Sequence, residues 1–227
     1  MISVVLPIHN QADHIEQVVA QYRASLERLH HPYELVLVPN ACRDRSVEVC
    51  ERLAAGSAEV RSVPLAQGGW GRAVRAGLAA AQGDLLCYTN SARTNGETLF
   101  LLLAYGLAHP SAVIKANRRL RESLFRRAGS LLYNLECRAL FNLACWDVNG
   151  TPKVFPRRYR PLLELRRDDD LIDLEFVVAC REGDYPLLEV PLLSPQRHGG
   201  RSTTNLKSAG RLYFGALAIW RAQRRAA

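Results

Sequence analysis

The sequence predicts an α/β protein with a mainly parallel central sheet and helices on both faces. Short apolar runs, typical of buried strands, alternate with longer segments whose apolar residues recur at helical spacing. The 227 residues, 48% of them hydrophobic, suit one large domain with a sizeable core. A polar loop, Thr89 to Arg93, follows the apolar run Leu85 to Tyr88. Because ligands bind just beyond the carboxyl ends of parallel strands, this loop is the first place to expect a site.

The first half of the chain alternates regularly between strands and helices. Strands are expected over residues 3–6, 35–38, 60–65 and 85–88. The first helix has an apolar stripe from Ile15 to Leu29, with Asn10 or Asp13 as its expected N-cap. The other two are expected from Asp44 or Ser46 to Gly56, and from Ala73 to Gln82 after a glycine-rich loop.

The second half is less regular. Helices are expected over residues 97–108 and 171–181, strands over 112–116, 153–155 and 187–193, and one or two arginine-rich helices over 117–146. Pro191 assigns the last strand to a sheet edge or a bulge. We expect a domain over residues 1–205, with a nucleotide-binding half to about 116 and an acceptor half over 117–205, followed by an amphipathic helix over 206–227.

The charge of the chain favours an anionic partner. The formal net charge is +8, which suits a membrane surface, nucleic acid or a phosphorylated substrate. Nucleic acid is the weakest of these, because no aromatic stacking surface interleaves the arginines. The six cysteines include no Cys-x-x-Cys pair, and they are expected to be reduced, mostly buried thiols. With neither a basic leader nor an apolar run long enough to span a bilayer, the protein is expected in the cytoplasm, peripheral at the inner membrane face.

Three segments of the first half resemble family 2 glycosyltransferases of the GT-A fold. Ser3 to Asn10 resembles the opening strand and nucleotide loop of that family, Glu34 to Asn40 its second strand and base-reading loop, and Gly71 to Gly77 its diphosphate-side loop and helix. The second half is similar to the dolichyl-phosphate mannose synthase-like branch. The matching segments are Asn149 to Phe155, Asp173 to Glu175, Glu189 to Pro191 and Gly200 to Ser202.

Two departures from the family pattern concern metal binding. Pro39 and Asn40 stand where the family has paired aspartates, and Thr89, Asn90 and Ser91 replace its metal-binding Asp-x-Asp. Neutral hydroxyls and amides are poor ligands for Mg²⁺. We therefore expect no metal cofactor. Mg²⁺ or Mn²⁺ is expected only if another carboxylate, such as one in the run 168–170, takes over the role.

The resemblance implies a set of site residues. Those expected to bind the donor are Pro7, His9, Asn40, Arg72, Thr89, Asn90 and Ser91. Those expected to bind the acceptor are Arg118, Arg126, Arg127, Arg197, Arg201 and Ser202, although part of this arginine run can be solvated surface charge. Asp173, Glu175 and Arg72 are the candidate catalytic residues. Positions two apart on a helix face different ways, so only one of the two acids is expected to reach the site; both also suit a helix N-terminus.

The expected function is inverting transfer of a sugar from a nucleoside diphosphate, uridine diphosphate first, to a polyprenyl phosphate. Such an acceptor is already anionic, so catalysis would depend on positioning and on stabilising the departing diphosphate. The alternative is a relative that kept the fold as a binding or scaffold protein. The helix over 206–227 is expected to lie on an anionic membrane surface, with docking onto the core or an oligomer contact as alternatives.

Overall fold

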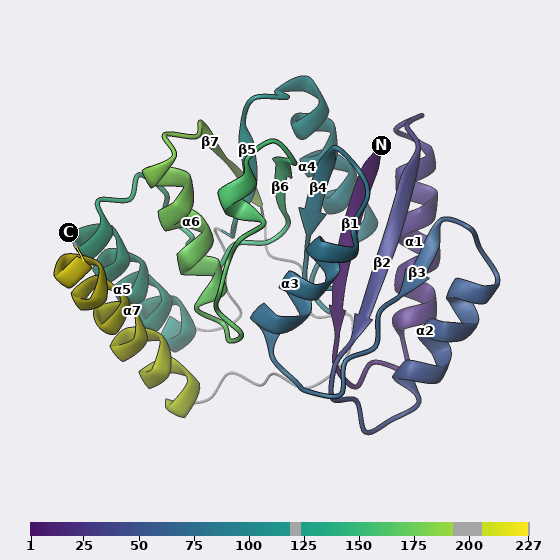
Figure 1. The fold of residues 1–227 in the computed structure, drawn as a ribbon, viewed down its shortest axis with the longest axis horizontal. Coiled ribbons are helices and arrows are strands. Elements are labelled where there is room, and N and C mark those ends of the chain that lie inside the picture. Colours follow the sequence, from purple (N-terminus) through teal and green to yellow (C-terminus); the bar gives the residue numbers. More distant parts are fainter. Residues whose placement is uncertain (119–123, 193–205, 227) are drawn as a thin grey trace.

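The computed structural model describes residues 1–118, 124–192 and 206–226 of the chain (Figure 1). Their centre is a seven-stranded sheet in the order β3-β2-β1-β4-β6-β5-β7. The strands are β1 (Ile2–Ile8), β2 (Tyr33–Pro39), β3 (Val60–Ser62), β4 (Leu85–Tyr88), β5 (Val113–Arg118), β6 (Lys153–Pro156) and β7 (Leu187–Leu192). Only β6 runs antiparallel to its neighbours β4 and β5, so the prediction of a mainly parallel sheet is confirmed.

The helices lie close to their predicted positions. They are α1 (Ile15–Glu27), α2 (Ser46–Ala55), α3 (Trp70–Ala80), α4 (Gly96–Ala108), α5 (Leu124–Phe141), α6 (Ile172–Glu182), α7 (Leu206–Ala226) and the 3-10 turn η1 (Arg160–Leu162). The start of the arginine-rich stretch differs from the prediction. Its first two residues extend β5, because Asn117 and Arg118 continue the parallel ladder with β7.

Two local predictions are corrected by the geometry of the loops. Neither Asn10 nor Asp13 caps α1, which begins after His14. Asn10 adopts a left-handed conformation (φ 52°), and its side-chain oxygen accepts from the Arg43 amide, so it ties two loops together. The third strand ends at Ser62, and a single parallel bridge from Asn40 to Leu65 replaces its expected final residues.

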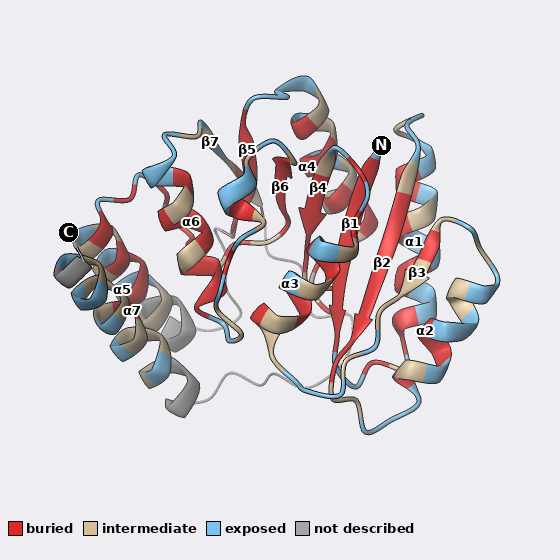
Figure 2. Ribbon diagram, viewed as in Figure 1, coloured by how far each residue is buried: buried red, intermediate tan, exposed pale blue. Residues whose placement is uncertain are grey.

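The sheet separates two apolar layers, as the alternation of side chains along a strand requires. Val4, Leu35 and Cys87 face the layer formed with α1, α2 and α4. Val5 and Tyr88 face the other layer, which α3, α5 and α6 complete. Figure 2 shows strands β1, β2, β4, β5 and β6 as a buried band between these layers, while the edge strands β3 and β7 are partly exposed. The expectation for the cysteines is borne out, because all six thiols are free and all but Cys42 are buried.

Helix α7 lies beside α5 at one end of the molecule (Figure 1). Ala216 is fully buried there, and Leu212, Ile219 and Trp220 pack against the same core cluster. Most of the apolar face of α7 is therefore used within the fold. At the sheet edge, β7 carries Pro191 as predicted, since a proline without an N–H fits an edge strand. Within the described ranges, no helix combines the length and apolar character needed to cross a bilayer.

Candidate functional site

Asn40 holds together the loops at the carboxyl ends of β1 and β2. Its side-chain nitrogen donates to the Ile8 carbonyl at 2.8 Å, and its side-chain oxygen accepts from the Gly69 amide at 3.2 Å. The His9 ring lies against the Asn40 carbonyl, with 2.8 Å between Nδ1 and that oxygen. The side chain of Asn40 is buried and engaged on both ends. It therefore fixes the position of the glycine-rich loop relative to the first two strands.

The triplet after β4 points largely inward. The Thr89 hydroxyl lies 2.7 Å from the Thr94 hydroxyl, and the Ser91 hydroxyl donates to Gln11 Oε1 at 2.6 Å. Both side chains are fully buried. Asn90, which is partly exposed, closes the turn by accepting from the Ala92 amide. These three side chains shape the loop through neutral hydrogen bonds.

This donor set does not fit a divalent cation. Mg²⁺ and Mn²⁺ favour carboxylates and phosphate oxygens, and the buried hydroxyls of Thr89 and Ser91 are turned toward protein partners. Asp44, the acid after β2, uses one oxygen on the Ser46 amide and the other on the Ala12 amide. Across the described part of the chain, no group of three histidines, cysteines or acids could hold a metal ion.

The glycine-rich loop packs directly on the acidic run that precedes α6. Gly69 has a φ of 147°, which favours glycine, and a Cβ there would lie 2.4 Å from the Asp168 carbonyl oxygen. A Cβ on Gly71 would lie 2.3 Å from the Arg167 carbonyl oxygen. Two glycines therefore allow backbone contact between segments almost a hundred residues apart in the chain.

Arg72 and Arg75 converge on one carboxylate. Arg72 Nη2 donates to one oxygen of Asp168 at 2.7 Å, and Arg75 Nη1 donates to the other at 2.6 Å. Hydrogen bonds from Arg72 and then Arg75 hold the pKa of Asp168 below its usual range. All three side chains are partly exposed, so the two guanidinium groups form a cationic surface beside the Asn40 loop.

Asp173 lies in a buried cluster below this surface. It accepts from the Tyr88 hydroxyl at 2.9 Å and from Trp70 Nε1 at 3.2 Å, and it forms an ion pair with Lys153. Burial lowers the pKa of Lys153, an effect that the Asp173 carboxylate opposes. Burial and the same carboxylate raise the pKa of the Tyr88 hydroxyl. Asp173 thus links the end of β4, where the loop 89–93 begins, to the start of α3, where the glycine-rich loop ends.

Glu175 faces away from Asp173. Its carboxylate accepts from the backbone amides of Arg166 and Arg167, each at 2.9 Å, and so fixes the segment that carries Asp168. Of the two candidate acids, only Asp173 reaches toward the sheet, which agrees with the expectation from helical spacing.

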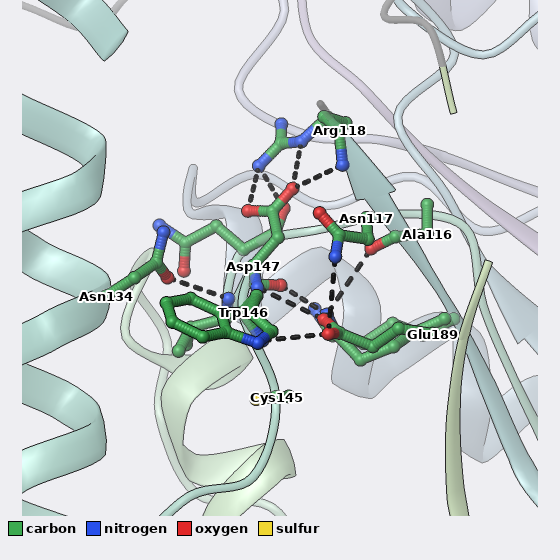
Figure 3. A network of polar contacts seen from close by, with 12 residues as sticks. Ala116, Asn117, Arg118, Asn134, Cys145, Trp146, Asp147 and Glu189 are labelled. Carbon is green, nitrogen blue, oxygen red and sulfur yellow. Dashed lines mark hydrogen bonds and ion pairs between the residues drawn. The ribbon is translucent and has the colours of Figure 1, made fainter. Parts of the chain in front are cut away.

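Arg118 ends β5 in a two-point ion pair with Asp147. Its Nε and Nη2 donate to the two Asp147 oxygens at 2.7 and 2.9 Å, and Nη2 also donates to the Asn149 carbonyl (Figure 3). Burial opposes the charge of Arg118, but the Asp147 carboxylate outweighs that effect and raises the arginine pKa. Among the expected acceptor residues, Arg126 and Arg127 lie in the first turn of α5 with side chains that are not described, and Arg197, Arg201 and Ser202 lie outside the described residues.

Glu189 organises the same region from β7. It accepts from Lys115 Nζ at 2.8 Å, from the Trp146 amide at 2.8 Å and from the Asp147 amide at 3.1 Å (Figure 3). The sequence reasoning assigned no role to Lys115, Lys153 or Asp147. A usable signal was present for the two lysines, because each lies within an apolar strand, where a charge requires a buried partner. For Asp147, a loop residue, we found no comparable signal.

A profile described as Glycosyl transferase family 2 matches residues 3–121, which is just over half of the chain. The chain therefore belongs to glycosyltransferase family 2, and the family resemblance drawn from the motifs is confirmed. Among similar solved structures is glucosyl-3-phosphoglycerate synthase from Mycobacterium tuberculosis, in complex with Mn²⁺, uridine diphosphate and phosphoglyceric acid. It superposes with a TM-score of 0.74 at 20% identity, covering 97% of this chain and 78% of that one. This likeness supports the GT-A fold.

The similar curated proteins share a name that includes a polyprenyl phosphate. Undecaprenyl-phosphate 4-deoxy-4-formamido-L-arabinose transferase of Pseudomonas fluorescens (strain Pf0-1) is 26% identical over 217 residues, which is 88% of this chain and 59% of the relative. The protein of that name from Pseudomonas aeruginosa (strain LESB58) is 28% identical over 185 residues, or 80% and 50% of the two chains. The chain thus spans about half to three fifths of the length of these relatives.

Proposed function

We propose that this protein transfers a sugar from a nucleoside diphosphate sugar to a polyprenyl phosphate. The observation that carries the proposal is the cationic pair Arg72 and Arg75, which lies beside the Asn40 loop of a family 2 fold. The names of the similar undecaprenyl-phosphate transferases support the acceptor class. The uridine diphosphate bound in a structural neighbour supports the choice of that nucleotide.

The donor would lie over the ends of β1, β2 and β4. Pro7, His9, Asn40 and the triplet Thr89, Asn90 and Ser91 would form its floor, with Asn40 acting through the loops it holds. The diphosphate would meet Arg72 and Arg75 by displacing Asp168 from them. Two guanidinium groups can take phosphate oxygens in the two-point geometry they now offer to a carboxylate.

The reaction would need no protein base. One oxygen of the acceptor phosphate attacks the anomeric carbon while the bond from that carbon to the nucleoside diphosphate breaks, which inverts the configuration. The electron pair of the broken bond leaves with the diphosphate, next to Arg72 and Arg75. Asp173 is already paired with Lys153, so its proposed role is to hold Trp70 and Tyr88 in place rather than to accept a proton. Glu175 would act through the Asp168 segment.

The acceptor phosphate would be bound on the side of Arg118. We assign it to Arg126 and Arg127 at the start of α5, and to Arg197, Arg201 and Ser202. Arg118 itself is committed to Asp147, so its contribution would be to fix the end of β5 from which the chain leads to α5. Substitution of Arg201 by alanine should raise the KM for the acceptor about ten- to hundredfold, with little effect on the KM for the donor.

Transfer is proposed to proceed without a metal bound at residues 89–91, because that triplet offers no carboxylate. The test is turnover of uridine diphosphate sugars with undecaprenyl phosphate in detergent, with and without a chelator, together with calorimetry of uridine diphosphate binding. Turnover and affinity that survive chelation support the proposal. If chelation abolishes both and Mn²⁺ restores them, metal independence is wrong. If the nucleotide binds and no transfer occurs with any sugar donor, the protein is a binding or scaffold relative.

We place this activity at the cytoplasmic face of a membrane, where a lipid-linked acceptor presents its phosphate. The net charge of +8 supports an anionic surface as partner.

A further inference from the structure

The positive charge of the chain is concentrated on two adjacent helices. Helices α5 and α7 together contain eight basic residues and one acidic residue, Glu136. They thus account for seven of the eight net positive charges of the whole protein. The two helices lie side by side at one end of the molecule (Figure 1). The remainder of the protein, which contains the whole sheet and the donor side, is close to neutral.

Helix α5 has an apolar face that the core does not use. Its inward side buries Tyr133, Cys137 and Phe141. Leu131, Leu132 and Leu135, one to four positions apart, are nevertheless between 45% and 60% exposed. A helix on the surface of a soluble domain normally presents polar residues there. Three exposed leucines on neighbouring positions therefore require a partner outside the core.

Two further exposed aromatic residues lie on or beside the same two helices. Phe214 on α7 is 76% exposed, the most exposed large apolar side chain in the described part of the chain. Trp146, in the loop after α5, is 51% exposed and stacks on Arg138, with 4.0 Å from the guanidinium carbon to the ring centre. Exposed leucine and phenylalanine among basic residues, with an amphipathic tryptophan, are typical of surfaces that lie at the boundary between lipid head groups and acyl chains.

We propose that the outer surface of α5 and α7 lies on an anionic lipid bilayer, with Leu131, Leu132, Leu135 and Phe214 inserted among the lipids. This inference deepens the proposed function, on which it rests, by assigning the surface that meets the membrane. The sequence alone suggested the apolar residues of α7 for this role. The structure instead packs Leu212, Ala216 and Trp220 of α7 into the fold and leaves the leucines of α5 outside.

The charge of this surface favours lipid over a second copy of the chain. A symmetric dimer through it would oppose two helix pairs of like charge, seven positive charges on each. An anionic bilayer complements the same charge, and each arginine or lysine near such a surface strengthens binding about fivefold. The arrangement also suits the substrate, because α5 follows β5 within a few residues of Arg118, on the side assigned to the acceptor phosphate.

The experiment measures cosedimentation of the full chain with vesicles of phosphatidylglycerol and phosphatidylcholine that contain no polyprenyl phosphate. The test variant replaces Leu131, Leu132 and Leu135 with glutamine, which keeps helix propensity. The matched control replaces Leu101 and Tyr105 with glutamine. These two side chains are about 40% exposed on α4, which covers the opposite face of the sheet. Both variants are first shown to unfold at the temperature of the unmodified protein.

We expect the α5 variant to lose at least about tenfold in vesicle affinity, the control to bind like the unmodified protein, and all three to bind vesicles of pure phosphatidylcholine weakly. Equal binding by the two variants would overturn the inference. So would a dimer in solution that the α5 variant dissociates, because the leucines would then serve self-association. Vesicle binding without transfer to detergent-solubilised acceptor would refute the proposed function and leave the lipid surface standing.

Discussion

Different kinds of interaction hold the loops in the two halves of the sheet. At the ends of β1, β2 and β4, neutral hydrogen bonds join the loops: Asn40 to Ile8 and Gly69, Thr89 to Thr94, and Ser91 to Gln11. Around β5, β6 and β7 they are buried ion pairs: Lys115 with Glu189, Arg118 with Asp147, and Lys153 with Asp173. Both regions belong to one sheet, and both border the proposed site.

This difference indicates which charged side chains are available to bind a ligand. A buried ion pair costs desolvation, and removing one partner leaves the other charge stranded. The ion pairs around β5 to β7 therefore have a structural role, and their charged groups are engaged by each other. On the neutral side, Arg72 and Arg75 lie near the surface and form ion pairs with the half-exposed Asp168. Arg72 also donates to Gln67, and Arg75 to the Arg166 carbonyl. A carboxylate in that setting can be exchanged for a phosphate at little cost.

The largest expected effect comes from breaking the ion pair of Lys153. Substitution by methionine should lower the free energy of unfolding by about 3–5 kcal/mol, because it strands the buried Asp173 carboxylate. Urea denaturation monitored by circular dichroism measures this loss of stability. Arg181→Met is the matched control, since Arg181 forms an exposed 4.0 Å pair with Glu182 and should cost less than about 1 kcal/mol. If Lys153→Met lowered the free energy of unfolding as little as the control does, the contrast between the two regions would be wrong.

A charge placed in the neutral region should be the next most costly change. Ser91→Asp restores one acid of the family triplet, yet Ser91 is fully buried against Gln11, so we expect a loss of about 3 kcal/mol. Asn90→Asp is the control. Asn90 is partly exposed and its oxygen only closes a turn, so the loss should stay below about 1 kcal/mol. A rise in the Tm of Ser91→Asp on adding Mn²⁺ would mean that position 91 does face a metal site.

Keeping the charge of Arg118 but removing its planar fork should have an intermediate effect. Lysine cannot donate to both Asp147 oxygens and the Asn149 carbonyl in the arginine geometry. Arg118→Lys should therefore cost about 1.5–3 kcal/mol of unfolding free energy and leave nucleotide affinity unchanged. Arg45→Lys tests the exposed counterpart, the pair with Glu48, and should change stability by no more than about 0.5 kcal/mol. Weaker nucleotide binding by Arg118→Lys would show that the two regions are coupled.

If the diphosphate displaces Asp168 from Arg72 and Arg75, removing the Asp168 carboxylate should raise the affinity for the nucleotide. Asp168→Asn leaves Arg72 and Arg75 without a competing carboxylate, so uridine diphosphate should bind up to about fivefold more tightly by calorimetry, the scale of an exposed ion pair. Asp84→Asn is the control, because Asp84 lies just before the amino-terminal end of β4, opposite to the candidate site, and forms an ion pair with the Met1 amino group. Weaker binding by Asp168→Asn would mean that Asp168 orients the two arginines for the diphosphate.

The smallest expected effect is the pH dependence of the same contact. The two arginines lower the pKa of Asp168, so its contribution to stability is present above the unfolded-state pKa of about 4 and is lost as pH falls through the lowered folded value. The difference in unfolding free energy between the unmodified protein and Asp168→Asn should therefore shrink toward pH 2–3. A difference that stays constant into this acid range would show that the ion pair does not contribute to stability.

The sequence by itself determined the order of the strands and helices, the polar loops that follow them and the lack of carboxylates at residues 89–91. These features depend on local periodicity and on turn chemistry, which neighbouring residues decide. Pro191 limited β7 to a sheet edge or a bulge, because its missing N–H is a property of one residue, and β7 lies at the edge. The same periodicity indicated that Asp173 and Glu175 point different ways.

Only the tertiary structure decided what each polar side chain faces. Asp168 meets Arg72 from 96 residues away, and Asp173 meets Tyr88 from 85. The amide of Asn40, one of the residues expected to bind the donor, holds the glycine-rich loop. Helix α5 keeps a second apolar face outside the core. The period of a strand or helix fixes which side a residue occupies. That period carries no information on which residues pack against that side, because the packing of distant segments decides which residues meet there.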